Sequence, residues 1–210
     1  MNRRIAKFEK VSKEKSIMDY LNRRIAKFEK VSYEQFLKDM MDTFTLPDNI
    51  KEKYVKDMYD NIKLPKRATA GSAGYDFFSP LDYFKLKPGE SIKIPTGIKC
   101  EMNNHWVLQI FPRSGLGFKY RCQLDNTVGI IDSDYFYSDN EGHIFIKITN
   151  DTKVNYDDYI DDIRKMPRQK IEIKRGEGFA QGIFLPYGLT VDDECAGVRN
   201  GGFGSTDKKE

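Results

Sequence analysis

Hydrophobic and polar residues follow two different patterns along this chain. Between residues 33 and 62 the apolar positions recur at helical spacing, and Pro47 divides the stretch into two predicted helices. Ser32 followed by Gln35 resembles a capping box, which predicts the start of the first helix. The apolar stripe consists of Phe36, Leu37, Met40, Met41 and Phe44, followed by Ile50, Tyr54, Met58 and Ile62. Such a stripe either packs on the protein's own core, the commoner outcome, or forms a partner surface.

From Leu64 onward the apolar runs become short, and apolar residues alternate with polar ones between turn signals. The clearest alternating runs are residues 91–94, 106–110, 144–148 and 171–173. Many short strands bounded by turns predict an all-β sandwich or barrel. The acidic, tyrosine-rich segment 151–169 breaks this rhythm and is interpreted as an insertion with a short helix. The glycine-rich residues from Gly197 predict a mobile arm.

The N-terminus contains an exact repeat. Residues 2–12 read NRRIAKFEKVS, and residues 22–32 repeat them. Two copies are too few for a solenoid. If residues 25–28 supply a strand to the core, the identical residues 5–8 have no second position in the core to occupy. We therefore expect residues 1–21 to form a loosely attached extension, residues 22–206 to form the domain, and residues 207–210 to form a charged tail.

Composition narrows the classes of protein. The 210 residues suit one domain, and 35 basic against 32 acidic residues give no reason to expect a nucleic-acid groove. We expect no membrane span, because no apolar run approaches the roughly 20 residues that one needs. Three scattered cysteines, Cys100, Cys122 and Cys195, favour a reducing cytoplasm over a disulfide framework. Two histidines without a CxxC pair argue against a zinc site.

Residues 129–135 (GIIDSDY) carry the first candidate chemistry. Two branched apolar residues run into Asp132, and a carboxylate at the end of a strand is ionised at neutral pH and can take a proton from water. The plainer interpretation is a strand that ends in a polar turn. Upstream, Arg113, Ser114 and Gly115 combine a planar fork of donors, a hydroxyl and an accessible backbone, which together suit phosphate oxygens. Such a tripeptide also occurs by chance in turns.

Residues 201–206 (GGFGST) offer a second phosphate cradle, with Arg199 just upstream. The glycines alone indicate a flexible tail. A phenylalanine such as Phe203 is unusual in a flexible linker unless its ring packs on another group. An aromatic ring can stack on a nucleotide base. Phosphate ligands, a base platform and a general-base aspartate together imply a nucleotide that is attacked by water.

At this point the sequence resembles the trimeric, all-β dUTP diphosphatase (dUTPase) family, which has five short motifs. All five occur here in order over residues 62–206: residues 73–76 (AGYD), 112–116 (PRSGL), 126–135 (NTVGIIDSDY), 176–181 (GEGFAQ) and 199–206. The resemblance implies a dUTPase-like β-barrel or jelly roll (β-clip) with a helical N-terminal extension and a mobile glycine-rich C-terminal arm. It also implies a homotrimer in which each active site draws on three chains.

The resemblance assigns a role to each matching residue. Asp132 would be the general base for attack of water on the α-phosphorus of dUTP, which yields dUMP and diphosphate, keeps uracil out of DNA and supplies dUMP for dTMP synthesis. Mg²⁺ would be coordinated mainly by the triphosphate, and Asp76 would at most contact metal-bound water. The expected uracil hairpin comprises Asn126, Gly129, Ile130 and Ile131, with Tyr135 against the deoxyribose. The expected phosphate ligands are Arg113, Ser114, Gly115, Gln181, Arg199, Gly204, Ser205 and Thr206, with Phe203 over the uracil.

Four features depart from the family pattern. Gly178 stands where the fourth motif commonly carries arginine, and Arg199 lies one residue closer to Phe203 than usual. The glycine after Tyr135 is delayed to Gly142. The insertion at 151–169 and the helices before Leu64 also exceed the minimal core, as in elaborated bacterial or phage members, and we expect a Gram-positive bacterium or its phage as the source.

Two alternatives stay open. A dCTP deaminase-like enzyme shares the fold and an Arg-Ser pair, although the hairpin and the complete fifth motif favour dUTP. A phage-type dUTPase could also act as a regulatory protein whose inserted segments bind a repressor-type partner. A purely structural β-protein leaves five ordered motifs unexplained.

Overall fold

The computed structural model describes residues 25–46, 51–153 and 169–197. Within these residues the fold is mostly β-strand, with two helices before the main strands, as the sequence predicts. The predicted loose extension at residues 1–21, the helix expected within the insertion at 151–169 and the glycine-rich arm lie largely or wholly outside the described residues.

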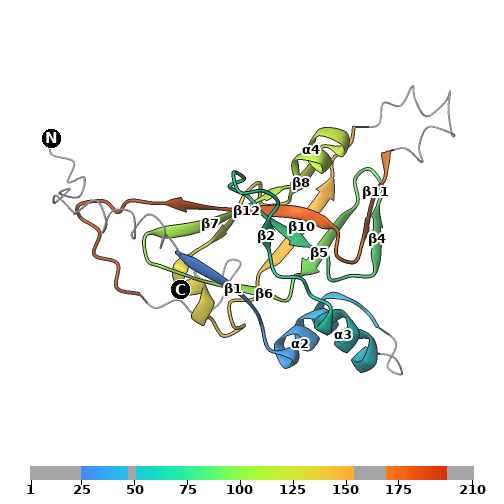
Figure 1. Ribbon diagram of the computed structural model, residues 1–210, viewed down its shortest axis with the longest axis horizontal. Helices are drawn as coiled ribbons and strands as arrows, with labels where there is room; N and C mark the ends of the chain where they lie inside the picture. Colours follow the sequence, from blue (N-terminus) through green and yellow to red (C-terminus); the bar gives the residue numbers. More distant parts are fainter. Residues whose placement is uncertain (1–24, 47–50, 154–168, 198–210) are drawn as a thin grey trace, which may run out of the picture.

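The described residues contain four antiparallel sheets (Figure 1). The largest has the order β2-β3-β12-β7-β9, and a three-stranded sheet has the order β5-β10-β8. The strands of these two sheets are β2 (Lys66–Arg67), β3 (Tyr75–Phe78), β5 (Ser91–Pro95), β7 (Trp106–Pro112), β8 (Cys122–Leu124), β9 (Gly129–Ile131), β10 (Phe145–Asn150) and β12 (Gly178–Pro186). The two smaller sheets pair β1 (Ala26–Lys30) with β6 (Ile98–Met102), and β11 (Ile171–Lys174) with β4 (Tyr83–Leu86).

Each of the four alternating runs predicted as strands forms one. The alternation also predicts the faces: in β10, Ile146 and Ile148 are buried, while Lys147 between them is exposed. Period-two alternation of this kind places every second side chain on the core face of a sheet.

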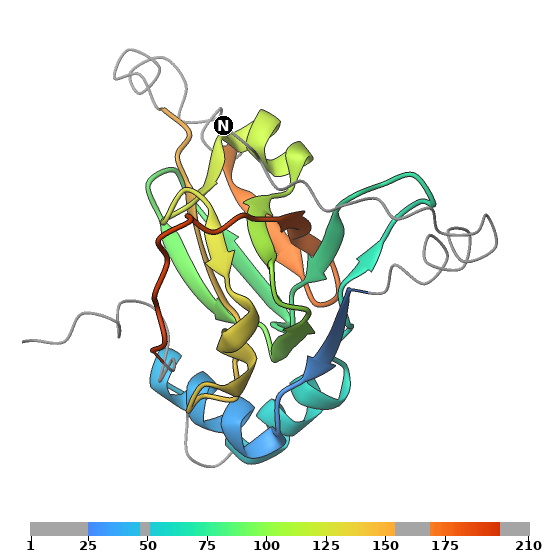
Figure 2. The same cartoon turned by 90° about the vertical axis from the view of Figure 1, so that its left-hand side faces the viewer.

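The two predicted helices are α2 (Tyr33–Thr43) and α3 (Lys51–Asp60), which lie side by side at one end of the sheets (Figures 1 and 2). Their apolar stripe packs on the protein's own core, because Phe36 and Met40 of α2 and Met58 of α3 are buried. Val55, which was not part of the predicted stripe, is also buried. It lies three residues before Met58 and therefore shares its helix face.

The capping box at α2 forms in half. The Ser32 Oγ accepts the Gln35 N–H at 3.1 Å, as predicted. Gln35 does not return the bond: its side chain donates to Asp39 at 2.8 Å, and the Ser32 N–H donates instead to Glu141 at 2.8 Å. A carboxylate from a distant loop therefore completes the cap of this helix.

The second copy of the N-terminal repeat supplies β1. This strand pairs with β6 in the register Phe28 to Cys100. Its Phe28 ring packs against the rings of Tyr75, Phe77 and Phe184, with centroids 5.5–5.7 Å apart. These contacts give the residues of the second copy a defined place in the core.

Candidate active site

The third motif begins in a tight turn that connects two sheets. Thr127 has a φ of 65° and donates its N–H to Leu124 O at 2.9 Å, with Asn126 at the centre of the turn. The antiparallel pairing of the expected uracil hairpin is limited to one bridge, Leu124 to Thr127, because β8 pairs with β10, whereas β9 pairs with β7. The turn thereby carries the chain from one sheet to the next and leaves Asn126 exposed at the junction.

A pocket of about 550 Å³ lies against this turn. It is lined by the residues that sequence reasoning assigned to the uracil, the sugar and the attacking water, namely Asn126, Gly129, Ile130, Ile131, Asp132 and Tyr135. β9 places them there, because it holds Gly129 opposite Ile110 and Ile131 opposite Leu108 on β7. A Cβ at residue 129 would lie 3.1 Å from the Ile110 Cβ, so a larger residue there would require Ile110 to shift.

Asp132 stands at the point where β9 ends and the 3₁₀ turn η1 (Ser133–Tyr137) begins. It occupies the N-cap position in an extended conformation, and its side chain makes no capping hydrogen bond to the turn. The carboxylate is half-buried at the pocket wall, whereas Asp134 is exposed. This difference supports Asp132, rather than Asp134, as the candidate base.

Tyr135 is buried and lines the same pocket. Its hydroxyl donates to His143 O at 2.7 Å and accepts from Asn140 Nδ2 at 2.8 Å. The hydroxyl is therefore fixed by its own loop. The ring can serve as a wall of the pocket without using its polar end.

Seven further pocket residues were missed from the sequence. Four have charged or aromatic side chains, namely Lys93, Asp125, Phe145 and Lys147, and the other three are the aliphatic Ile110, Leu124 and Val128. Lys93 and Lys147 are direct partners across β5 and β10, and Lys93 lies 4.8 Å from the Phe145 ring centroid. Lys147 pairs with Asp125 at 2.5 Å. Burial by itself would raise the pKa of Asp125, but hydrogen bonds from Lys147 and Thr149 lower it below its usual value. The alternation of both strands places these lysines on the polar face, but only the pairing of β5 with β10 brings them together.

A second group of predicted residues gathers near the end of β7. Arg113 Nη2 lies 3.7 Å from Asp76 Oδ2, and Arg113 Nη1 donates to Gly178 O at 3.4 Å. Gln181 on β12 pairs in register with Asp76 on β3 and with Phe111 on β7. Arg113, Ser114 and Gly115 are exposed at the start of α4 (Ser114–Tyr120). A helix start presents backbone N–H groups without intrahelical partners, which suits phosphate oxygens.

The two groups lie apart within one chain. Ile131, just before Asp132, pairs with Leu108 on β7. Arg113 lies five residues after Leu108, just beyond the end of the same strand. At a rise of roughly 3.3 Å per residue, the base and the arginine are separated by on the order of 15 Å. Among the described residues, the structure therefore brings together those predicted to bind the nucleoside and, separately, those predicted to bind phosphate. It does not unite the two groups in one pocket of a single chain.

Arg199, Phe203, Gly204, Ser205 and Thr206 lie outside the described residues. Within the described part of the chain, no three histidine, cysteine or carboxylate side chains are grouped to hold a metal ion. Burial raises the pKa of the Cys100 thiol to about 12 and that of Cys122 to about 11, so neither thiol is poised as a nucleophile. None of the helices in residues 25–46, 51–153 and 169–197 has the length and apolar character needed to cross a membrane.

Comparison with known proteins matches this arrangement to one family. Residues 60–160 match the dUTPase family model. The chain is 38% identical over 148 residues to the deoxyuridine 5′-triphosphate nucleotidohydrolase of Lactococcus lactis. The aligned region covers 69% of this chain and 88% of that protein. The chain is 33% identical over 153 residues to the enzyme of the same name from Escherichia coli strain S88, covering 70% and 88% of the two chains.

Solved structures agree with the sequence relatives. The dUTPase from Streptococcus mutans superposes with a TM-score of 0.51 at 30% identity, over 79% of this chain and 98% of that one. The dUTPase of staphylococcal phage 80alpha shares the fold, with a TM-score of 0.52 at 21% identity over 84% and 99% of the two chains. The chain belongs to the dUTPase family, the dUTP diphosphatases that hydrolyse dUTP to dUMP.

Proposed function

We propose that the chain hydrolyses dUTP by attack of a water molecule on the α-phosphorus, with Asp132 as the general base. The observation that carries this mechanism is that the Asp132 carboxylate and the turn around Asn126 line the same pocket. Asp132 takes a proton from the water as its oxygen bonds to the α-phosphorus. The bond from that phosphorus to the β-phosphate bridging oxygen breaks, and dUMP and diphosphate leave.

Selection for uracil follows from the backbone of the turn. Asn126 and the polar backbone groups of Gly129, Ile130 and Ile131 pair with the uracil edge, so that cytosine presents mismatched donors. The Tyr135 ring lies against the deoxyribose and leaves no room for a 2′-hydroxyl. A site built to match hydrogen bonds can discriminate by several orders of magnitude, because a wrong base leaves buried groups without partners.

Arg113, Ser114, Gly115 and Gln181 hold the phosphates, supplied by another subunit of a homotrimer. Support for sharing comes from the separation of these residues from Asp132, since one chain does not bring base and phosphate ligands into a single pocket. The glycine-rich arm completes the site: Phe203 covers the uracil, and Arg199, Gly204, Ser205 and Thr206 close on the terminal phosphates. A lid of this kind excludes bulk solvent from the site while the attacking water stays bound.

Mg²⁺ enters with the substrate in this proposal. dUTPases generally use this ion, and when bound it neutralises phosphate charge and orients the triphosphate. The donor set fits a metal held mainly by phosphates, because the described residues offer Asp76 beside Arg113 rather than a cage of carboxylates. Asp76 would meet metal-bound water at most.

The finer architecture is part of the same proposal. The sheets close into a dUTPase-like β-barrel or jelly roll. Residues 22–206 form the domain, with insertions at about 33–62 and 151–169. Residues 1–21 form a loosely attached extension at the N-terminus, and residues 207–210 form a charged tail at the C-terminus. The cytoplasmic location and the absence of a nucleic-acid partner stay predictions from composition.

A second role is suggested by one relative. Structures of the phage 80alpha dUTPase are described in terms of phage control of virulence-gene transfer. A repressor-type partner that binds the insertion at 151–169 remains an alternative for this chain. A pulldown of such a partner that is unchanged by deletion of residues 151–169 would count against this surface.

The proposal is tested by a nucleotide panel. Purified protein with Mg²⁺ is incubated with dUTP, dCTP, dTTP and UTP, and release of diphosphate and of ammonia is measured. We expect diphosphate from dUTP at a rate far above the other three. Ammonia from dCTP would instead support the deaminase alternative, and equal rates for all four nucleotides would contradict the uracil slot.

A further inference from the structure

We infer that helix α2 is a brace for the nucleoside pocket, and that its Asp39 positions Tyr135 for dUTP binding by acting through His143. This inference rests on the proposed role of the pocket, and it concerns a helix outside residues 60–160, the part of the chain that matches the family model. The relevant unit is the segment of residues 132–143, called here the pocket loop.

The pocket loop is a continuous hydrogen-bonded unit. Its backbone N–H groups donate from Tyr135 to Asp132, from Ser138 to Tyr135 and from Glu141 to Ser138, at 2.8–3.2 Å. His143 N–H then donates to Asn140 O at 3.1 Å. The loop thus links the proposed base at its start to His143 at its end, and a displacement at one end is transmitted along short, consecutive turns.

The end of the loop is fixed by a buried polar pair. His143 is fully buried, and its Nδ1 lies 2.6 Å from Asp39 Oδ2 on α2. The other ring nitrogen, Nε2, accepts the Gly97 N–H at 2.7 Å. A nitrogen that accepts from a backbone amide carries no proton, so the ring proton lies on Nδ1 and is donated to Asp39. Gln35 donates to the same carboxylate oxygen and orients it.

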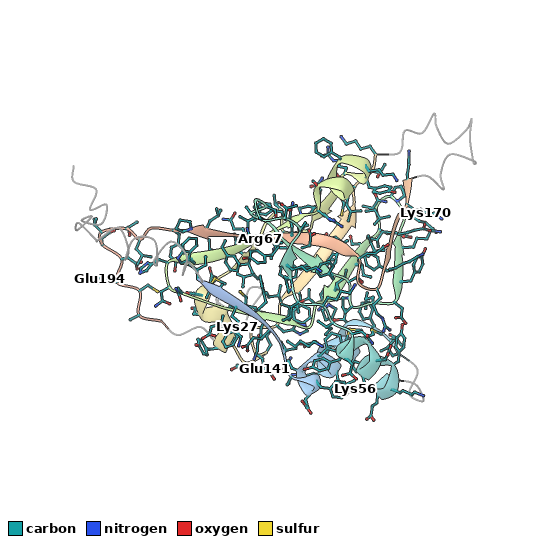
Figure 3. The ribbon with its side chains drawn as sticks, in the orientation of Figure 1. Lys27, Lys56, Arg67, Glu141, Lys170 and Glu194 are labelled. Carbon is teal, nitrogen blue, oxygen red and sulfur yellow. The ribbon has the colours of Figure 1, made fainter. Side chains whose placement is uncertain are left out.

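A second link joins the start of α2 to the same loop. Glu141 accepts hydrogen bonds from the Ser32 N–H at 2.8 Å and from the Ser32 hydroxyl at 2.5 Å. Glu141 adopts a φ of 56°, which is unfavourable for a residue with a side chain and which these contacts help to hold. Figure 3 shows Glu141 beside the start of α2. The helix therefore grips the pocket loop at two points, Glu141 and His143.

The pocket is affected through Tyr135. Its hydroxyl donates to the His143 carbonyl, and its ring lines the pocket where the deoxyribose is expected. On the far side, the His143 ring packs 4.6 Å from the ring of Phe145, which lines the same pocket. Loss of the Asp39 contact leaves a buried imidazole N–H without its acceptor, and the ring must move to find another. Movement of His143 shifts Tyr135 and Phe145 together.

The test compares Asp39→Ala with Met40→Ala on the same helix. Met40 is 1% exposed and makes an apolar contribution to the core, so its truncation destabilises α2 without touching the polar link. Asp42→Ala, at an exposed carboxylate on α2, is the control for loss of charge. Asp39→Asn retains an oxygen acceptor for the His143 Nδ1–H and serves as the conservative variant. If Asp39→Ala does not fold, Asp39→Asn is assayed in its place. Steady-state kinetics with dUTP and with UTP give kcat, KM and the ratio of the two kcat/KM values.

We expect Asp39→Ala to raise KM for dUTP and to lower the preference for dUTP over UTP by about tenfold, because the sugar wall is displaced. Met40→Ala and Asp42→Ala should keep the wild-type ratio, and Asp39→Asn should recover most of it. An equal effect of Asp39→Ala and Met40→Ala on the ratio, or an Asp39→Asn ratio no higher than that of Asp39→Ala, would overturn the inference. Where Asp39→Ala does not fold, an Asp39→Asn ratio no lower than that of Met40→Ala would overturn it. A wild-type protein that does not hydrolyse dUTP would instead overturn the proposed function.

Discussion

Arg113 occupies the space that a side chain on residue 178 would need. Its Nη1 donates to Gly178 O at 3.4 Å, and a Cβ built on Gly178 would lie 2.9 Å from that nitrogen. This is the position at which the family motif commonly carries arginine. In this chain the Arg113 guanidinium lies against Gly178 and is also 3.7 Å from the Asp76 carboxylate.

The first prediction follows from this contact. Gly178→Ala should displace the flexible end of Arg113, raise KM for dUTP by about tenfold and leave the fold intact, since a charge-assisted contact contributes roughly 1.5–3 kcal/mol. Kinetics and thermal unfolding measure the two effects. Gly188→Ala is the control, because nothing lies within 4 Å of a Cβ there. A Gly178→Ala enzyme with unchanged KM would show that Arg113 does not hold substrate.

The second prediction concerns the base. Asp132→Asn keeps the shape of the pocket wall but cannot take a proton, so kcat should fall by about 10²–10⁴-fold while dUTP still binds. Calorimetry measures the binding, and diphosphate release measures the turnover. Asp134→Asn, two residues along on the exposed face of η1, should retain activity. If Asp132→Asn stays fully active, the base has been assigned wrongly.

The third prediction concerns the arm. Deletion of residues 199–210 removes Phe203 and the proposed ligands of the terminal phosphates, so kcat/KM for dUTP should fall by at least about 100-fold, the scale of losing preorganised electrostatic contacts. The oligomeric state, measured by light scattering, should not change. Dissociation of the oligomer would mean that the arm has a structural role instead.

The fourth prediction is a pH dependence. Burial alone would raise the pKa of Glu141, but hydrogen bonds from the Ser32 hydroxyl and N–H, with the charge of Lys99, lower it below its usual value. A carboxyl with a lowered pKa in the folded state stabilises the protein above its unfolded pKa, and this contribution is lost as the pH falls below about 4.5. Thermal unfolding between neutral pH and pH 3.5 should show this loss in the wild type. Glu141→Gln should be less stable at neutral pH and should show a smaller further loss in acid; parallel curves would contradict the assignment.

The fifth prediction concerns the repeat. Deletion of residues 2–21 leaves the residues of the second copy, including Phe28 in its aromatic cluster, in place. We expect the free energy of unfolding to change by less than about 0.5 kcal/mol, the range of surface changes without packing consequences. Urea denaturation measures it. A larger loss would show that the first copy packs on the domain.

The sequence by itself determined the elements and the family. Alternation predicted the strands at residues 91–94 and 144–148, helical spacing and Ser32 predicted α2, and five ordered motifs indicated a dUTPase. These are local signals, because period, capping and motif are written in consecutive residues. The same signals indicated Asp132 as the base, although no single motif could distinguish it from an ordinary turn residue.

Only the tertiary structure decided which of these residues meet. The pairing of β5 with β10 brings Lys93 opposite Lys147, and the packing of α2 brings Asp39 to His143, 104 residues away in the chain. The pairing of β9 with β7 separates Asp132 from Arg113 within one chain. The order of the motifs alone would place these two residues in one site. Such contacts depend on strand register and helix docking, which the free energy of the whole core selects and which short sequence patterns do not encode.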